Sequence, residues 1–344
     1  TRDDSLSLLS IYAQYIDTPT TFEITLPTEE EFKNICEEIK VELNEYHKLY
    51  NIYLRYDGMN NLRVINDVTD GKHSVVKVDK KIIDLLLYSK EMYTLTNGKI
   101  NVAMGSVLSI WHKYRNWGLD DPANAELPPK EKLEEAMKHT DFNKIEINEE
   151  NNTVFLSDPE MTLDVGAIAK GYAVERIAEY LINKGVTDFL LNIGGNVRTI
   201  GMGKDNEPWK VGIENPNIEK QEEIPHIEYL KLSDMSLVTS GCYQRFYEVN
   251  GKNYHHIIDP ETLLPGDRYL SVSVLTKDSE ETFVPKSIIS KPLLSSIILT
   301  MFLPISWISP FTVAITILTP FEEPLLTFVL IPDTSTQMCA SAPS

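Results

Sequence analysis

Residues 164–170 combine the residue types that most often meet a phosphate group. The segment reads Asp-Val-Gly-Ala-Ile-Ala-Lys, so an acidic residue ends an expected strand, a glycine allows a tight turn and a helix begins at once. Free amides and the positive end of the helix dipole lie at a helix N-terminus, which suits an anion. The segment differs from a Walker A loop, because Lys170 precedes Gly171 instead of following it. Judged by spacing alone, an ordinary strand-to-helix turn capped by Asp164 explains it equally well.

Two adjacent histidines lie in residues 254–260, which read Tyr-His-His-Ile-Ile-Asp-Pro. Alternation along a strand puts His255 and His256 on opposite faces, so at most one of them faces any given site. A histidine close to an acid-proline turn is well placed to act as a general base. For either histidine taken alone, an exposed strand residue without function is the simpler interpretation. The chain shows neither zinc-site spacing nor the GxSxG motif of serine hydrolases.

Three further segments carry residues that could line a ligand, and each also has a plain structural interpretation. The glycines of residues 192–196 bring backbone close to a partner or form a bulge. Residues 100–105 place a Met-Gly turn before an amphipathic helix, which could line an aromatic ring, although core packing is the default interpretation. Residues 239–243 offer hydroxyl groups and the thiol of Cys242. We interpret that thiol as structural, because no basic neighbour is placed beside it.

Both helices and short strands are needed to position these segments. Capping residues and helical spacing predict helices from Thr28, from Asp79, after residues 128–129 and over residues 166–183. Alternating apolar residues predict strands, listed here by range: 144–156 as a hairpin, 188–193, 197–201, 209–214, 226–232, 236–239, and a second hairpin turned at 250–251. Helices packed on a largely antiparallel β-sheet predict an α+β fold.

The charge of the chain restricts its partners. The 344 residues carry 32 basic and 51 acidic side chains, a formal charge of -19. So negative a surface repels phosphate backbones, which argues against nucleic acid as a partner. A phosphate-bearing ligand must therefore be met locally, by backbone amides, a bound cation or a few placed basic groups. Three widely spaced cysteines form neither a disulfide framework nor a zinc knuckle.

The composition changes near the end of the chain. All 16 glycines lie at or before Gly266, and prolines recur from residue 285 onward. The 30 residues between Lys291 and Glu322 are uncharged and long enough to span a bilayer, but Pro304 and Pro310 would break a helix there. We therefore interpret residues 278–344 as an atypical hydrophobic, proline-rich tail, frame-shifted or disordered, with a membrane anchor as the alternative.

Taken in order, the motifs resemble those of the FAD:protein FMN transferase family, the flavin transferases called ApbE. The resemblance covers residues 11–277, which we expect to form the flavin transferase domain. It rests on five ordered blocks, at residues 164–173, 192–195, 209–213, 239–241 and 256–260. It implies an α+β domain of ApbE or T-fold-like type. The chain departs from the family pattern at Asn101 and Ala103, where the family usually has Asp and Thr.

The resemblance also implies a role for each matched residue. His256 would deprotonate a threonine hydroxyl of a client flavoprotein, and that oxygen would attack the flavin-proximal phosphorus of FAD while AMP leaves. The main-chain oxygen of Ala167 would bind a magnesium ion. Clients of the family are flavin-carrying subunits of sodium- or proton-linked respiratory complexes and related exported reductases. The residues expected to contact FAD are Ile16, Tyr56, Ala103, Met104, Gly105, Asp164, Lys170 and Ile258.

The rest of the expected magnesium site is not matched. In the family, an Asp and a Thr ligand follow the strand expected here at residues 270–276, but this chain continues as Lys-Asp-Ser-Glu-Glu-Thr-Phe. Because Mg²⁺ prefers oxygen ligands that include a carboxylate, Ala167 alone would hold it weakly. Two alternatives therefore stay open beside the transferase. One is an FAD pyrophosphatase that uses water as the acceptor, and the other is a non-catalytic FAD-binding lipoprotein.

The resemblance further implies a location. Members of the family are exported, so we expect a periplasmic protein or one at the outer face of the cytoplasmic membrane, associated with it through a lipid anchor. The sequence starts at Thr1 rather than at Met, so it does not reveal a targeting segment.

Overall fold

The computed structural model describes residues 7–15, 18–68, 71–217, 222–243, 245–266, 269–276, 313–318 and 324–332. One large sheet contains strands β1 (Ser7–Tyr15), β2 (Thr18–Leu26), β6 (Phe189–Ile193), β7 (Asn196–Ile200), β10 (Ser236–Gly241), β13 (Tyr269–Thr276), β15 (Pro324–Pro332) and β14 (Val313–Leu318). The strands lie in this spatial order, and each neighbouring pair is antiparallel.

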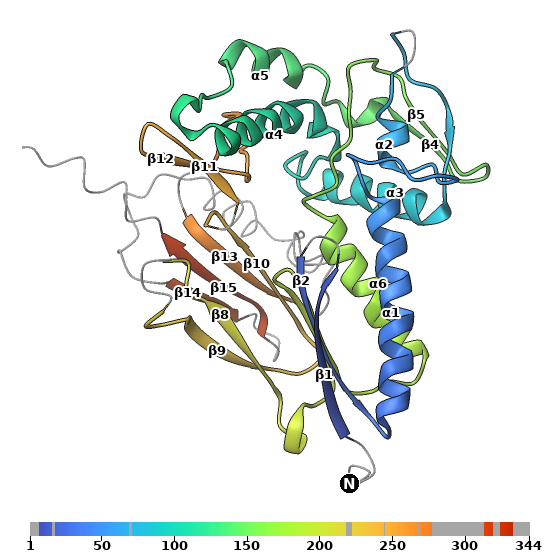
Figure 1. Ribbon diagram of the computed structural model, residues 1–344, viewed down its shortest axis with the longest axis vertical. Coiled ribbons are helices and arrows are strands. Elements are labelled where there is room, and N and C mark those ends of the chain that lie inside the picture. Colours follow the sequence, from blue (N-terminus) through green and yellow to red (C-terminus); the bar gives the residue numbers. More distant parts are fainter. Residues whose placement is uncertain are drawn as a thin grey trace, which may run out of the picture.

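Two helices cover one face of this sheet. Helices α1 (Glu29–Leu49) and α6 (Ala169–Asn183) lie side by side against it (Figure 1). Their apolar faces join β2 and β6 in one buried core, with Ile39, Phe22 and Leu191 all inaccessible to solvent. This arrangement confirms the predicted α+β fold with a largely antiparallel sheet.

Local signals predicted the start of α1 correctly. The Thr28 hydroxyl accepts a hydrogen bond from the Glu31 amide at 3.2 Å and donates one to the Glu31 carboxylate at 2.9 Å. Thr28 is therefore the predicted N-cap and satisfies one amide that the first helical turn leaves free, while the Glu31 carboxylate bonds to the Thr28 hydroxyl rather than to its amide. The next long helix, α3 (Lys80–Leu95), starts in the same way, because the Asp79 carboxylate accepts from the Lys81 amide at 2.8 Å.

A second, smaller core holds the region that contains the two histidines. It joins helices α4 (Gly105–Asp120) and α5 (Lys130–Met137) to the hairpin β11 (Phe246–Val249) and β12 (Lys252–His255). Tyr247 packs on α4 at Gly118, where a Cβ atom would come within 2.6 Å of the tyrosine ring. The Trp111 indole donates to the Leu263 carbonyl at 3.0 Å. These contacts hold the segment after β12 against α4.

The remaining described elements are short. They are α2 (Leu62–Ile65), the 3₁₀ turns η1 (Val102–Met104), η2 (Pro122–Asn124), η3 (Phe142–Lys144) and η4 (Lys204–Asn206), and the strands β3 (Val76–Lys77), β4 (Ile145–Asn148), β5 (Thr153–Leu156), β8 (Trp209–Glu214) and β9 (His226–Leu232). The predicted hairpin at residues 144–156 is β4 and β5, which pair as expected.

Two predictions about residues 164–183 were wrong in detail. The helix starts at Ala169 rather than at residue 166, and the segment before Asp164 has no regular secondary structure and is not a strand of any sheet. The amide of Gly166 donates to the Asp164 carboxylate at 2.8 Å, so this side chain competes with the first helical turn. Partners distant in the sequence replace the missing sheet neighbours, as shown below.

Part of the proline-rich segment joins the main sheet. Within residues 278–344 the structure describes β14 and β15, and β15 pairs with β13 along residues 269–275. The predicted domain boundary at residue 277 lies outside the described residues, so the division into domain and tail stays a prediction. No helix in the described ranges combines the length and apolar character needed to cross a membrane.

Candidate active site

Hydrogen bonds from residues distant in the sequence hold the Asp164 turn in place. The amide and carbonyl of Leu163 both bond to the Asn66 side chain, at 2.7 and 2.9 Å. The Asp164 amide donates to the Val102 carbonyl at 2.8 Å. Its carboxylate is only 9% exposed and accepts from the Gly166 amide. Asp164 is therefore held in one orientation by its neighbours.

The N-terminus of α6 presents groups that can bind a ligand. The amides of Ile168 and Ala169 donate to the Val165 carbonyl, but no described backbone amide donates to the exposed carbonyl of Ala167. The amide of Lys170, in the first turn of α6, also has no hydrogen-bond acceptor among the carbonyls that precede the helix in the described residues. Open amides at a helix N-terminus suit an anion, and an unpaired carbonyl suits a cation or a water molecule.

Lys170 adds a positive charge at the same place. Its side chain is half-buried and forms no ion pair with any carboxylate in the described part of the chain. Burial is the main cause that lowers the pKa of this ammonium group, and the charge of Arg245 adds to the effect. A bound phosphate would supply the missing counter-ion.

The hydrogen bonds of His256, which directly follows β12, fix which of its ring nitrogens carries the proton. Its Nδ1 lies 3.3 Å from the carbonyl oxygen of Arg245, which also accepts from the His256 amide. A carbonyl only accepts hydrogen bonds, so Nδ1 carries the proton and Nε2 keeps a free lone pair. Part of the ring is open to solvent, but burial of the rest lowers the pKa of His256 to about 4, with the charges of Arg245 and Lys170 adding to the effect. The imidazole is therefore neutral at pH 7.

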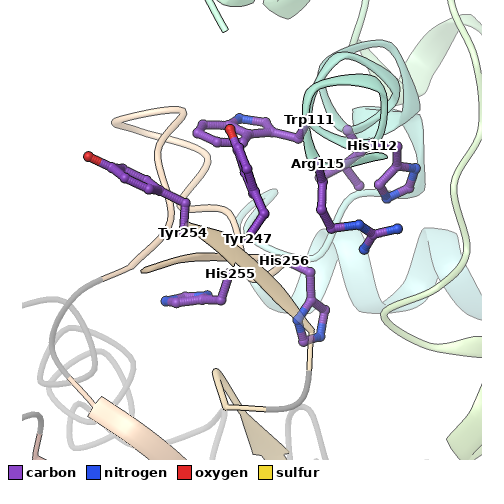
Figure 2. A pocket seen from close by; sticks show the side chains of 8 residues that line it. Trp111, His112, Arg115, Tyr247, Tyr254, His255 and His256 are labelled. Carbon is purple, nitrogen blue, oxygen red and sulfur yellow. The ribbon is translucent and has the colours of Figure 1, made fainter. Parts of the chain in front are cut away.

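His255 points away from His256, as the alternation predicted (Figure 2). Its Nε2 faces the Gly266 carbonyl, and its Nδ1 accepts from the Ile257 amide at 3.2 Å. Both ring nitrogens therefore hold the local loop together. Asp259 has a similar structural task, because its carboxylate accepts from the amide of Glu261 at 2.8 Å and caps the turn that follows.

A shallow hollow opens between α4 and the β11–β12 hairpin. Figure 2 shows the Arg115 side chain extending from α4 and the His256 ring on the segment that follows β12, and both residues line the hollow. The residues that line the hollow are Leu108, Trp111, His112, Arg115, Tyr247, Tyr254, His255 and His256.

His112 connects this hollow to the Asp164 turn. Its Nε2 lies 3.9 Å from a carboxylate oxygen of Asp164, and its Nδ1 lies 3.0 Å from the hydroxyl of Tyr53. Burial is the main cause that lowers the pKa of His112, Asp164 opposes the shift, and the charges of Arg115 and Arg245 add to it. The Asp164 turn and the His256 hollow thus belong to one site.

Sequence reasoning missed His112 and Arg115. Both lie on the helix that the sequence predicted after the Met-Gly turn, but its apolar residues suggested only core packing. The available signal was spacing, because Leu108, Trp111 and Arg115 follow one another after three and then four residues and share one helix face.

The predicted contacts at residues 103–105 lie behind the Asp164 turn. Ala103 is fully buried and Met104 is 6% exposed. Gly105 touches residue 162 so closely that a Cβ atom would lie 2.3 Å from the Thr162 carbonyl oxygen. Direct contact of these three residues with a flavin stays a prediction.

The other predicted contacts are more scattered. The Tyr56 hydroxyl lies 3.3 Å from the Asn51 amide nitrogen and 3.4 Å from Nε2 of His47. Ile258 is half-buried and forms an isolated bridge with Pro265 close to the hollow. Ile16 lies outside the described residues.

The glycine turn and the threonine motif lie next to each other. Gly194 and Gly195 both have positive φ angles, 56° and 83°, and form the tight turn between β6 and β7. The Thr239 amide donates to the Gly195 carbonyl at 3.1 Å. The plain structural interpretation of this glycine turn is therefore sufficient.

One residue of the expected magnesium site, Ala167, lies among the described residues. The free carbonyl of Ala167 suits one ligand position, but no group of three His, Cys, Asp or Glu side chains within the described ranges could hold a metal. Residues 277–283, where the family has its other ligands, lie outside the described residues.

Comparison with known proteins identifies the family. Residues 18–282 match the model of the ApbE family. A relative from Klebsiella pneumoniae, named FAD:protein FMN transferase, is 30% identical over 239 residues, which cover 67% of this chain and 70% of the relative. A relative of the same name from Vibrio cholerae is 33% identical over 185 residues, about half of each chain.

Solved structures agree with the sequence match. The crystal structure of the ApbE protein from Thermotoga maritima superposes with a TM-score of 0.66 at 26% identity, covering 80% of this chain and 84% of that one. The flavin transferase ApbE from Vibrio cholerae, at 24% identity and a TM-score of 0.64, shares the fold. With its family model matched along most of its length, the chain belongs to the ApbE family.

Proposed function

We propose that this protein transfers FMN from FAD to a threonine hydroxyl of a client flavoprotein and releases AMP. The observation that carries the proposal is His256, whose Nδ1 bonds to a carbonyl and leaves Nε2 free, and which lines the hollow. His112 connects this hollow to the Asp164 turn at the N-terminus of α6, where an anion can bind. The relatives named FAD:protein FMN transferase support it further.

The proposed reaction is a phosphoryl transfer. Nε2 of His256 takes the proton of the threonine hydroxyl, and the threonine oxygen bonds to the flavin-proximal phosphorus. The bond from that phosphorus to the bridging oxygen breaks, and AMP leaves with the bridging oxygen and the bonding electron pair. The proton on His256 passes to solvent, to which part of its ring is open.

The remaining groups neutralise and orient the substrate. The Lys170 ammonium and the open amides at the start of α6 lie where they can balance the charge of the pyrophosphate. Asp164, fixed by Asn66 and Gly166, is available to hold the adenosine side. We include magnesium in the proposal, with the Ala167 carbonyl as a ligand. The bound ion would neutralise charge on the phosphate oxygens.

The client and the location also belong to the proposal. We propose a client of the respiratory-complex or exported-reductase type, and an exported enzyme held at the membrane by a lipid. Growth of cells with a radiolabelled fatty acid, followed by isolation of the full-length protein, tests the anchor. An unlabelled protein would contradict it.

A product assay tests the function itself. The protein is mixed with FAD, Mg²⁺ and the subunit of a respiratory complex that normally carries flavin, prepared without its flavin. A variant of that subunit without the acceptor threonine serves as the control. Flavin fluorescence that stays on the denatured subunit, and is absent from the control, supports transfer. Free FMN with AMP would show hydrolysis instead, and bound but unchanged FAD would show plain binding.

A further inference from the structure

Arg115 lies in the candidate active site without a role in the reaction described above. It is half-buried on α4, one helical turn beyond Trp111, and it lines the hollow. Figure 2 shows its side chain extending from α4 above the segment that carries His256, and both residues line the hollow. The side chain is thus placed to meet whatever His256 acts upon.

The charge of Arg115 is not balanced by the protein. Arg115 forms neither an ion pair nor a side-chain hydrogen bond with any of the described residues, and Arg245 forms no ion pair either. Arg115 lines the hollow, and Arg245 bonds through its carbonyl to His256. The other arginines of the described ranges each pair with a carboxylate: Arg55, Arg63, Arg176 and Arg198.

This exception is informative in so acidic a chain. With 51 acidic and 32 basic side chains, carboxylates outnumber cations, and four of the six described arginines pair with one. In addition to burial, Arg115 and Arg245 both lower the pKa of His112, Arg245 also lowers the pKa of Lys170, and Arg245 and Lys170 lower that of His256. Uncompensated like charges raise the free energy of the empty site, and a bound dianion removes this cost.

The chemistry of the guanidinium group indicates the anion. Its planar fork of N–H donors matches two oxygens of one phosphate, whereas an ammonium group acts as a point charge. Two cationic positions, Lys170 at the start of α6 and Arg115 beside His256, fit a ligand with two linked phosphates. The phosphate nearest His256 is the one that the threonine oxygen attacks.

We propose that Arg115 binds the flavin-proximal phosphate of FAD, opposite His256, and holds its phosphorus in position for transfer. This inference rests on the proposed function for the identity of the substrate. The cationic site itself can be tested with nucleotides, independently of any transfer.

The test compares Arg115→Ala and Arg115→Lys with Lys113→Ala. Lys113 is exposed on the same helix and does not line the hollow, so its loss removes one positive charge without touching the site. Calorimetry measures the affinities for AMP, ADP and FAD, and circular dichroism checks the fold of each variant. Single-turnover transfer at saturating FAD measures the rate.

We expect Arg115→Ala to weaken ADP and FAD binding at least roughly tenfold, as for a lost charge-assisted hydrogen bond, and to leave AMP binding unchanged. AMP is spared because it lacks the second phosphate. The transfer rate should fall by roughly 100-fold or more. Arg115→Lys should recover affinity in part but not the rate, and Lys113→Ala should match the wild type.

Each result decides something. Unchanged ADP affinity in Arg115→Ala overturns the inference, whatever happens to the rate, and so does an equal loss for AMP and ADP. If the variant loses ADP affinity selectively while the wild type transfers no FMN, the phosphate site stands and the proposed function fails.

Discussion

Replacing Gly105 with alanine tests how the candidate active site is supported. A Cβ atom at this position would lie 2.3 Å from the Thr162 carbonyl oxygen and 2.8 Å from the Leu163 carbonyl carbon. Both neighbours are backbone atoms, so neither can rotate away. The start of α4 and residues 162–163 must therefore separate by about 1 Å to restore ordinary contact.

The separation should affect stability and activity together. The hydrogen bond from the Asp164 amide to the Val102 carbonyl crosses the same boundary and would lengthen. Overpacking costs about 1–3 kcal/mol, which exceeds the gain of up to about 1 kcal/mol from the helix propensity of alanine. The melting temperature should fall by roughly 2–8 °C. A displacement of about 1 Å at a reacting centre can cost roughly 100-fold in rate.

Calorimetry and single-turnover FMN transfer measure the two effects, with Gly185→Ala as the control. Gly185 follows α6 with φ at +84° and has no atom within 4 Å of its missing Cβ. Alanine there should cost about 1 kcal/mol through backbone strain and leave transfer unchanged. A Gly105→Ala variant that transfers FMN at the wild-type rate would refute the supporting role of Gly105.

Four further predictions follow from the structure. Nε2 of His256 must be unprotonated to act, and the pKa of this residue is lowered to about 4. The transfer rate should therefore stay constant as the pH is lowered from neutral and should fall only around pH 4. A fall centred near the ordinary histidine pKa would contradict the assignment. Burial alone would raise the pKa of Asp158, but hydrogen bonds from Lys144, the Glu160 amide and His139 lower it to about 2. Asp158→Asn should therefore lose about 1–3 kcal/mol in urea unfolding at pH 7, and its deficit should shrink as the pH falls from about 4 toward 2; a deficit independent of pH would argue against the ionic contribution. Thr28→Ala should lose about 1 kcal/mol in urea unfolding through the α1 cap and keep the wild-type transfer rate. Chelation of Mg²⁺ with EDTA should abolish transfer and added Mg²⁺ should restore it, as followed by client fluorescence; transfer that survives exhaustive chelation would remove Ala167 from the proposal.

Local signals in the sequence predicted local structure well. The capping box of Thr28 and the cap at Asp79 lie within a few residues of the helices they start, so their chemistry is visible in the sequence. Alternation also placed His255 and His256 on opposite faces. Which of the two serves as the base could be inferred from the sequence only through the family resemblance. The structure adds that both nitrogens of His255 are used by its own loop.

Contacts between distant residues could not be predicted in the same way. Leu163 bonds to Asn66, which lies 97 positions earlier, and this bracing replaces the strand that the sequence suggested before Asp164. Arg115 could be read as an ordinary charged residue on a helix surface. Only the folded chain shows that it lacks a carboxylate partner among the described residues and lines the same hollow as His256. Charge balance in a site depends on all the elements around it.

The central claim is that His256 is the base of an otherwise preformed phosphate site. The most direct test measures single-turnover formation of client-bound FMN by wild type and His256→Ala at saturating FAD, with FAD affinity determined on the same samples. We predict a rate loss of roughly 100-fold or more, with FAD affinity within a few-fold of the wild type. An unchanged rate, or a loss explained entirely by weaker FAD binding, would contradict the account.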